Sequence, residues 1–166
     1  MNAIATLAAL AEPWASLYND TPLLQSAVTF VHFAGLLLGG GFAVAADAAT
    51  LRGARGTEPE RARLAADLHA THRPVLLGLG ATFVSGVLMF AADLEELGTA
   101  PVFWIKMALI ALLLANGAVM ARTEAALRGD RLAADVAWPR LRRTAAASFA
   151  LWFVTLLAGT LLLNAG

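Results

Sequence analysis

A histidine and a lysine stand inside stretches that are otherwise apolar enough to cross a membrane. His32 lies in Val28–Asp47, VTFVHFAGLLLGGGFAVAAD, and Lys106 lies in Pro101–Ala121, PVFWIKMALIALLLANGAVMA. An ionisable group inside a membrane span is costly and is by default a functional-site hypothesis. Histidine is a common axial ligand of haem iron in helical bundles. Lys106 has two interpretations: it snorkels to the headgroups, or it holds an acidic group such as a porphyrin propionate.

Small residues surround this histidine on its helical face. On a wheel of 100° per residue, the face of His32 also carries Gly35, Gly39, Ala43 and Ala46. The apolar run that follows has its own stripe of Gly78, Ser85 and Met89. Small residues in membrane helices indicate close helix packing, and a planar cofactor between helices requires missing side chains as well. Both interpretations stay open, and Met89 is one possible second ligand for a haem on His32.

A second group of metal-ligating residues lies near the other end of the first span. Asp47 closes that span, and His69 and His72 stand three residues apart, which places both imidazoles on one helical face. Two histidines and a carboxylate suit zinc or iron, whereas the alternative is that the histidines are solvated. At 1.5 Å per residue, His32 lies roughly 20 Å outward from Asp47 and Lys106 roughly 7 Å inside the outer boundary. The sequence therefore predicts two separate places, with His32 and Lys106 at similar depth.

The composition indicates a membrane protein. Of 166 residues, 59% are hydrophobic and 14% charged, with a mean hydropathy of +0.68, whereas soluble domains carry about 25% charge. Cysteine is absent, which excludes disulfides and thiol chemistry. The net charge of zero gives no reason to expect a nucleic-acid partner.

These patterns predict an all-α, polytopic four-helix bundle in a single membrane domain, residues 1–166. Residues 1–20 are predicted as an interfacial helix, and the transmembrane helices as 23–51, 74–92, 101–121 and 144–164. Segments 52–73 and 122–143 are predicted to be cytoplasmic. The first begins a helix at Thr57 with a capping box and is expected to lie against the membrane surface. The second is expected to be a helix interrupted at Gly129 and stopped by Trp138-Pro139.

The arginines predict the orientation. All eleven lie in the two polar segments, five in 52–73 and six in 122–143, and none lies at either terminus. The positive-inside rule then places both segments in the cytoplasm and both termini outside. We accordingly expect a multi-pass protein of the bacterial cytoplasmic, or inner, membrane.

Several short motifs carry a family resemblance over roughly Val28–Met120. They are VHFAGLLLGGG in the first span, DAATLRG at its inner end, SGVLMF closing the second span and FWIKMALIALLLAN opening the third. Their order resembles a group of uncharacterised bacterial four-span membrane proteins. More distantly, it is similar to copper-resistance D proteins and to the bacterial membrane protoporphyrinogen oxidases that bind haem b. The resemblance implies that His32 and Lys106 take the places of a functional histidine and lysine of those oxidases.

Three function classes follow from these observations. In the first, the protein binds haem b between its helices through His32 and Lys106, for electron transfer or porphyrin oxidation. In the second, it is a non-catalytic accessory subunit that packs in the lipid bilayer against a larger energy-transducing or transport complex, or forms a homo-oligomer. In the third, it handles copper through His32, Met89 and Met107, which are ligands suited to Cu(I).

Overall fold

The computed structural model describes residues 3–164, which form six helices and no strand. This confirms the predicted all-α class. Four of these helices are long and apolar enough to cross a membrane; they are α2 (Pro22–Gly53), α3 (Glu58–Ala92), α5 (Pro101–Arg128) and α6 (Ala134–Leu163). The remaining two are α1 (Ala3–Asp20) and the short α4 (Leu94–Thr99). Residues 1 and 2 of the predicted interfacial segment lie outside the described part of the chain.

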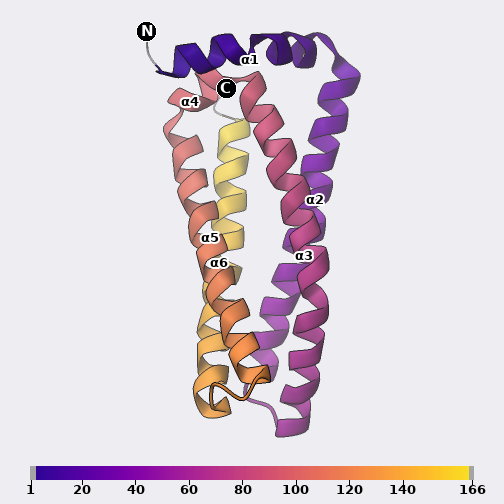
Figure 1. Ribbon diagram of the computed structural model, residues 1–166, viewed down its shortest axis with the longest axis vertical. Coiled ribbons are helices and arrows are strands. Elements are labelled where there is room, and N and C mark those ends of the chain that lie inside the picture. The colour runs from indigo at the N-terminus through magenta and orange to yellow at the C-terminus, as the bar shows by residue number, and fades with distance from the viewer. Residues whose placement is uncertain (1–2, 165–166) are drawn as a thin grey trace.

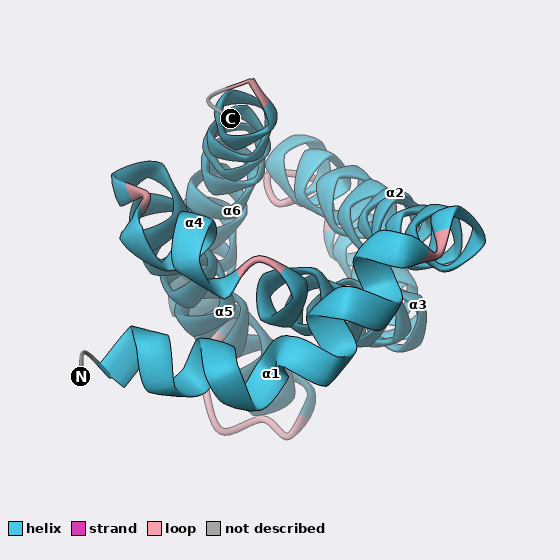
Figure 2. Cartoon of the chain, turned by 90° about the horizontal axis from the view of Figure 1, so that it is seen from above, coloured by secondary structure: helices cyan, strands magenta, loops and turns pink. Residues whose placement is uncertain are grey.

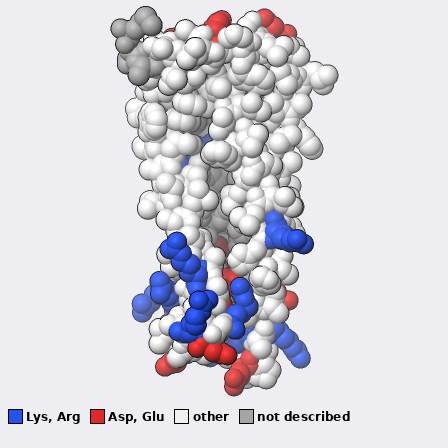
Figure 3. Space-filling model, in the orientation of Figure 1, with Lys and Arg blue, Asp and Glu red and all other residues white. Residues whose placement is uncertain are grey.

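The long helices run side by side as two pairs, α2 with α3 and α5 with α6, while α1 lies across one end of the bundle (Figure 1). Seen along the bundle, α1 crosses above the long helices (Figure 2). We call this the outer end and the opposite one the inner end, after the predicted orientation. The basic side chains of both polar segments gather at the inner end (Figure 3). The side of the membrane that each end faces stays a prediction.

Helices α3 and α5 touch near their two ends. Toward the outer end, the Phe90 and Phe103 rings stack with centroids 4.7 Å apart. Toward the inner end, His72 Nε2 lies 3.6 Å from Glu124 Oε2. Figure 3 shows that the surface is hollowed between these helices. We call this hollow the α3–α5 cleft.

The start of α3 has the capping box that its sequence predicts. Glu60 Oε2 accepts hydrogen bonds from the Thr57 backbone N–H at 2.6 Å and from its hydroxyl at 2.9 Å. These two bonds lower the pKa of the Glu60 carboxyl because they favour its ionised form. Proline within the first two positions of α2, α3 and α5 also suits a helix start, where its missing N–H has no partner to lose.

Both polar segments depart from their expected course. The predicted surface helix and the second span are one helix, since α3 passes through Pro74 without a break. The expectation that Trp138-Pro139 stops a helix is wrong, because α6 begins at Ala134 and continues through Pro139. Pro139 lies in the second turn and removes a single early hydrogen bond. The predicted interruption at Gly129 is confirmed, since α5 ends at Arg128.

Tertiary packing explains why these helices continue. The expectation that Leu64 and Leu68 lie against the membrane surface is wrong. Both are buried in a core at the inner end, together with Ala54, Trp138 and Leu141. Leu141 is completely buried and Trp138 is 4% exposed. The burial of large apolar side chains stabilises a helix by more than one lost backbone bond costs.

The glycines of α2 bring it close to α3. A Cβ on Gly35 would lie 2.7 Å from Thr82 Oγ1, and one on Gly39 would lie 3.0 Å from the Leu79 backbone nitrogen. A Cβ on Gly78 would overlap the backbone of Gly39. The packing interpretation of the small residues is therefore confirmed for this pair of helices.

Candidate functional site

His32 is half-buried on α2 and is oriented by a side chain of α3. Its Nδ1 lies 3.1 Å from the Ser85 hydroxyl oxygen, and Ser85 is only 2% exposed. The Ser85 hydroxyl itself donates to the Ala81 carbonyl at 2.7 Å. A serine oxygen that has given its hydrogen to a carbonyl can still accept one, so the pairing favours the tautomer with the proton on Nδ1. The Nε2 atom then carries the lone pair that a metal ligand needs.

Two further residues of α3, Gly86 and Thr82, lie beside His32. A Cβ on Gly86 would lie 3.3 Å from His32 Cε1, so the absence of a side chain there makes room for the imidazole. The Thr82 hydroxyl donates to the His32 backbone carbonyl at 3.5 Å. Three neighbouring residues of α3 therefore fix the place of His32.

Lys106 of α5 lies in the same part of the bundle. Its charge acts electrostatically on His32, and its Nζ would lie 3.6 Å from a Cβ added to Gly159 of α6. Within residues 3–164, no carboxylate lies within ion-pair distance of Lys106. The structure thus places the histidine and the lysine that the sequence singles out within electrostatic range of each other, and no carboxylate of residues 3–164 pairs with the half-buried lysine.

The other residues predicted to hold a cofactor occupy different places. Gly35 and Gly39 face α3, whose backbone fills the space beside them. Met89 is partly buried on α3, one turn beyond Ser85, and its role as a second ligand stays a prediction.

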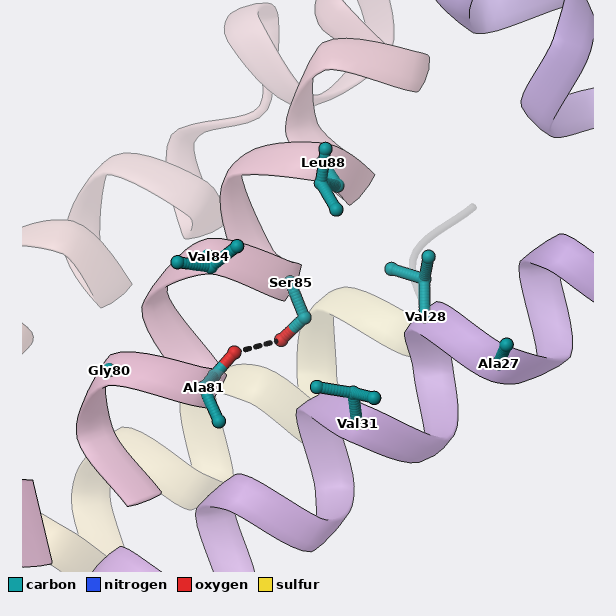
Figure 4. A pocket seen from close by; sticks show the side chains of 8 residues that line it. All are labelled: Ala27, Val28, Val31, Gly80, Ala81, Val84, Ser85 and Leu88. Atoms are coloured by element: carbon teal, nitrogen blue, oxygen red, sulfur yellow. Dashed lines mark hydrogen bonds between the residues drawn. The ribbon is translucent and has the colours of Figure 1, made fainter. Parts of the chain in front are cut away.

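An apolar furrow of about 420 Å³ lies between α2 and α3 next to this site. Ser85 is its only lining residue with a polar side chain, and the hydroxyl points along its own helix toward the Ala81 carbonyl (Figure 4). The other lining residues are Ala27, Val28, Val31, Gly80, Ala81, Val84 and Leu88. The furrow offers space for a hydrocarbon chain and no group that could ligate a metal.

The second predicted group of metal ligands does not assemble. His69 and His72 do share a helical face, with ring centroids 5.9 Å apart. However, His72 lies against Glu124, while the Asp47 carboxyl interacts with Ser148 of α6. Across residues 3–164, no three metal-ligating side chains come together.

Three residues of the polar interior are not predicted from the sequence. In the sequence, Ser85 stands out only as a small residue, and the predicted sites include neither Glu124 nor Ser148. For Glu124 a signal exists: it follows Lys106 by eighteen residues, which is five full helical turns, so both lie on one face of α5. Asn116, on the same helix, donates a side-chain hydrogen bond to the Thr144 carbonyl of α6 at 2.9 Å, which links α5 to α6.

Comparisons of the chain with models of protein families, with curated proteins and with solved structures gave no match. The class of protein is therefore assigned from the fold and the composition alone. The chain is an all-α protein whose four long apolar helices are compatible with an integral, multi-pass membrane protein in contact with lipid. Its outer half holds an oriented histidine and, within the described chain, a lysine without an anion.

Proposed function

We propose that this protein binds haem b in the outer half of the bundle and acts as a redox protein of the membrane. His32 is the axial ligand, and Lys106 pairs with a propionate. When bound, haem b supplies one-electron chemistry. The observation that carries the proposal is the pairing of His32 Nδ1 with the Ser85 hydroxyl at 3.1 Å.

That pairing is typical of a metal-ligating histidine. Such a histidine usually donates its second ring N–H to a neighbouring group, which fixes the tautomer and the ring plane. Here the hydroxyl is itself held by the Ala81 carbonyl at 2.7 Å, so it presents a lone pair to Nδ1. Within residues 3–164, no hydrogen bond occupies Nε2.

The charge and the space around the site support the same ligand. A half-buried lysine without a carboxylate partner favours a bound anion, because an uncompensated charge in an apolar environment is costly. The α3–α5 cleft is proposed as the way in from the side of the bundle, whose surface is hollowed there (Figure 3). Gly35 and Gly39 pack on α3 and are not part of the proposed cofactor site.

The protein is proposed to sit in the bacterial cytoplasmic membrane with its arginine-rich end in the cytoplasm. A partner that supplies or receives electrons is then needed, either within a membrane complex or in a homo-oligomer. The alternative, an accessory subunit without a cofactor, uses the same fold and leaves His32 without a ligand.

The test is the visible spectrum of protein purified in detergent from haem-replete cells. We expect a Soret band in the wild type and its loss in His32→Ala. The matched control is His69→Ala, which removes an exposed histidine of α3 and is expected to keep the band. Lys106→Met is expected to weaken haem retention because the propionate loses its cation.

A folded wild type that is colourless, and that takes up no haem when haem is added, would overturn the proposal and favour the accessory subunit. A Soret band that survives in His32→Ala would also overturn it, since another residue would then ligate the haem iron. Folding of each variant is checked by its helical circular dichroism.

A further inference from the structure

The Asp47 carboxyl is buried in the inner half of α2, and no cation of residues 3–164 lies within ion-pair distance of it. The residue is 2% exposed, and its Oδ2 is fully buried with no hydrogen bond to the described residues. Asp47 lies six residues before Gly53, so it stands roughly 9 Å from the inner end of its helix. An ionised carboxylate in such surroundings is strongly disfavoured, whereas the protonated acid is tolerated.

The neighbours of Asp47 supply a hydroxyl. Ser148 of α6, itself 7% exposed, interacts with the carboxyl. Thr50 stands one turn further along α2, but its hydroxyl is already directed to the Ala46 carbonyl at 2.9 Å. A carboxyl group that meets only a serine hydroxyl can donate a proton to the serine oxygen, which gives both groups a partner.

The two ion pairs at this end of the bundle involve a different carboxylate, that of Glu124. Glu124 of α5 is 5% exposed, and its Oε2 lies 3.6 Å from His72 Nε2 of α3 and 3.8 Å from Arg128 Nη1. Within residues 3–164, no cation lies within ion-pair distance of Asp47. Of the groups in these pairs, His72 belongs to α3 and both Glu124 and Arg128 belong to α5. Helix α6 contributes the uncharged hydroxyl of Ser148 beside Asp47.

We propose that Asp47 is a proton-binding site that exchanges its proton with water at the inner end of the bundle. Binding forms one O–H bond at the carboxyl and takes the site from one negative charge to neutral, and release returns the proton to water. Within residues 3–164, Asp47 belongs to no group of three metal-ligating side chains. The proposed route to water is the inner part of the α3–α5 cleft, where the surface of the bundle is hollowed (Figure 3). The proposal is independent of haem.

Infrared difference spectroscopy of the purified protein tests this site. A protonated carboxylic acid has a carbonyl stretch apart from the amide and carboxylate bands, and that stretch shifts when H₂O is replaced by D₂O. At neutral pH we expect such a band in the wild type, a shift within minutes of the solvent exchange, and loss of the band in Asp47→Asn. Ser148→Ala should keep the band and move its frequency, since the hydroxyl partner is gone.

Two variants assign the band. Asp67→Asn removes an exposed aspartate of α3 and is expected to leave the band unchanged. Glu124→Gln removes the second buried carboxyl, and a band that belongs to Asp47 should persist in this variant. A wild type without the band overturns the proposal, as does a band that survives in Asp47→Asn. A band that belongs to Asp47 but does not shift in D₂O also overturns it, because the proton is then sealed in the structure and exchanges with nothing.

Discussion

The orientation of a single imidazole depends on a serine from the neighbouring helix. His32 and Lys106 could be predicted from the sequence because charge stands out in an apolar run. The role of Ser85 could not, since it depends on which face of α3 packs on α2 and at what height. The 3.1 Å contact between Nδ1 and the hydroxyl arises only after the glycines of both helices have set the register.

Ser85→Ala tests this contact under the proposed function. Without the hydroxyl, the His32 ring loses its fixed tautomer and plane, so haem affinity should fall by about 10-fold to 100-fold, the usual effect of removing a partner of a metal-ligating histidine. Haem titration followed at the Soret band measures the change. Ser85→Thr keeps a hydroxyl and should retain most of the affinity. Ser26→Ala removes an exposed hydroxyl of α2 and serves as the control; equal affinity in Ser85→Ala and wild type would contradict the role.

Glu60 gives the start of α3 a pH dependence. Its pKa is lowered by the hydrogen bonds from Thr57, so its contribution to stability is complete above the ordinary pKa of a glutamate, about 4.3, and is lost as the pH falls through the lowered value. We expect the thermal midpoint of the wild type in detergent to drop more steeply in acid than that of Glu60→Gln. Circular dichroism at a series of pH values measures both. Glu58→Gln, in the same turn but outside the capping box, should follow the wild type.

At the scale of elements, α2 and α3 approach each other closely, and their contact rests on glycine. The side of Gly78 that faces α2 has no room for a methyl group, because the backbone of Gly39 occupies it. Gly80, two residues along the same helix, lines the open furrow between α2 and α3, and a Cβ added there would have nothing within 4 Å. The two positions allow a matched comparison of the same substitution at a filled and at an open position of α3.

Gly78→Ala should destabilise the protein by about 1–3 kcal/mol, since α2 and α3 must separate to accept the methyl group. Gly80→Ala should be neutral or stabilise by about 0.5–1 kcal/mol, the usual gain from replacing glycine in an open helical position. Thermal or denaturant unfolding in the same detergent measures both. Equal effects at the two positions would mean that the helices are not packed in this register.

The ends of the elements show where sequence patterns stop being informative. The capping box at Thr57 and the break at Gly129 were predictable, because both are local signals. Pro74 and Pro139 were misleading, because the inner core formed by Leu64, Leu68, Trp138 and their neighbours stabilises both helices past their prolines. That core joins residues about seventy positions apart in the sequence, and no local pattern reveals it.

At the scale of the whole molecule, the polar interior divides into two sites at different depths. Lys106 lies beside Gly159, and Asp47 lies beside Ser148, eleven residues earlier on α6. This spacing corresponds to roughly 16 Å along the helix. Each site therefore has its own end of the bundle, the first near α1 and the second near the arginines, and their separate functions can be tested one at a time.

Which side of the membrane each site faces follows from the arginines alone. Alkaline phosphatase is active only outside the cytoplasm, so a fusion within 129–133 should be inactive and one after Asn164 should be active. Fusions to a fluorescent protein that folds only in the cytoplasm should give the opposite pattern and control for expression. An active phosphatase within 129–133 would reverse the bundle. The His32 site would then lie in the cytoplasmic half, and Asp47 would exchange protons with the outside.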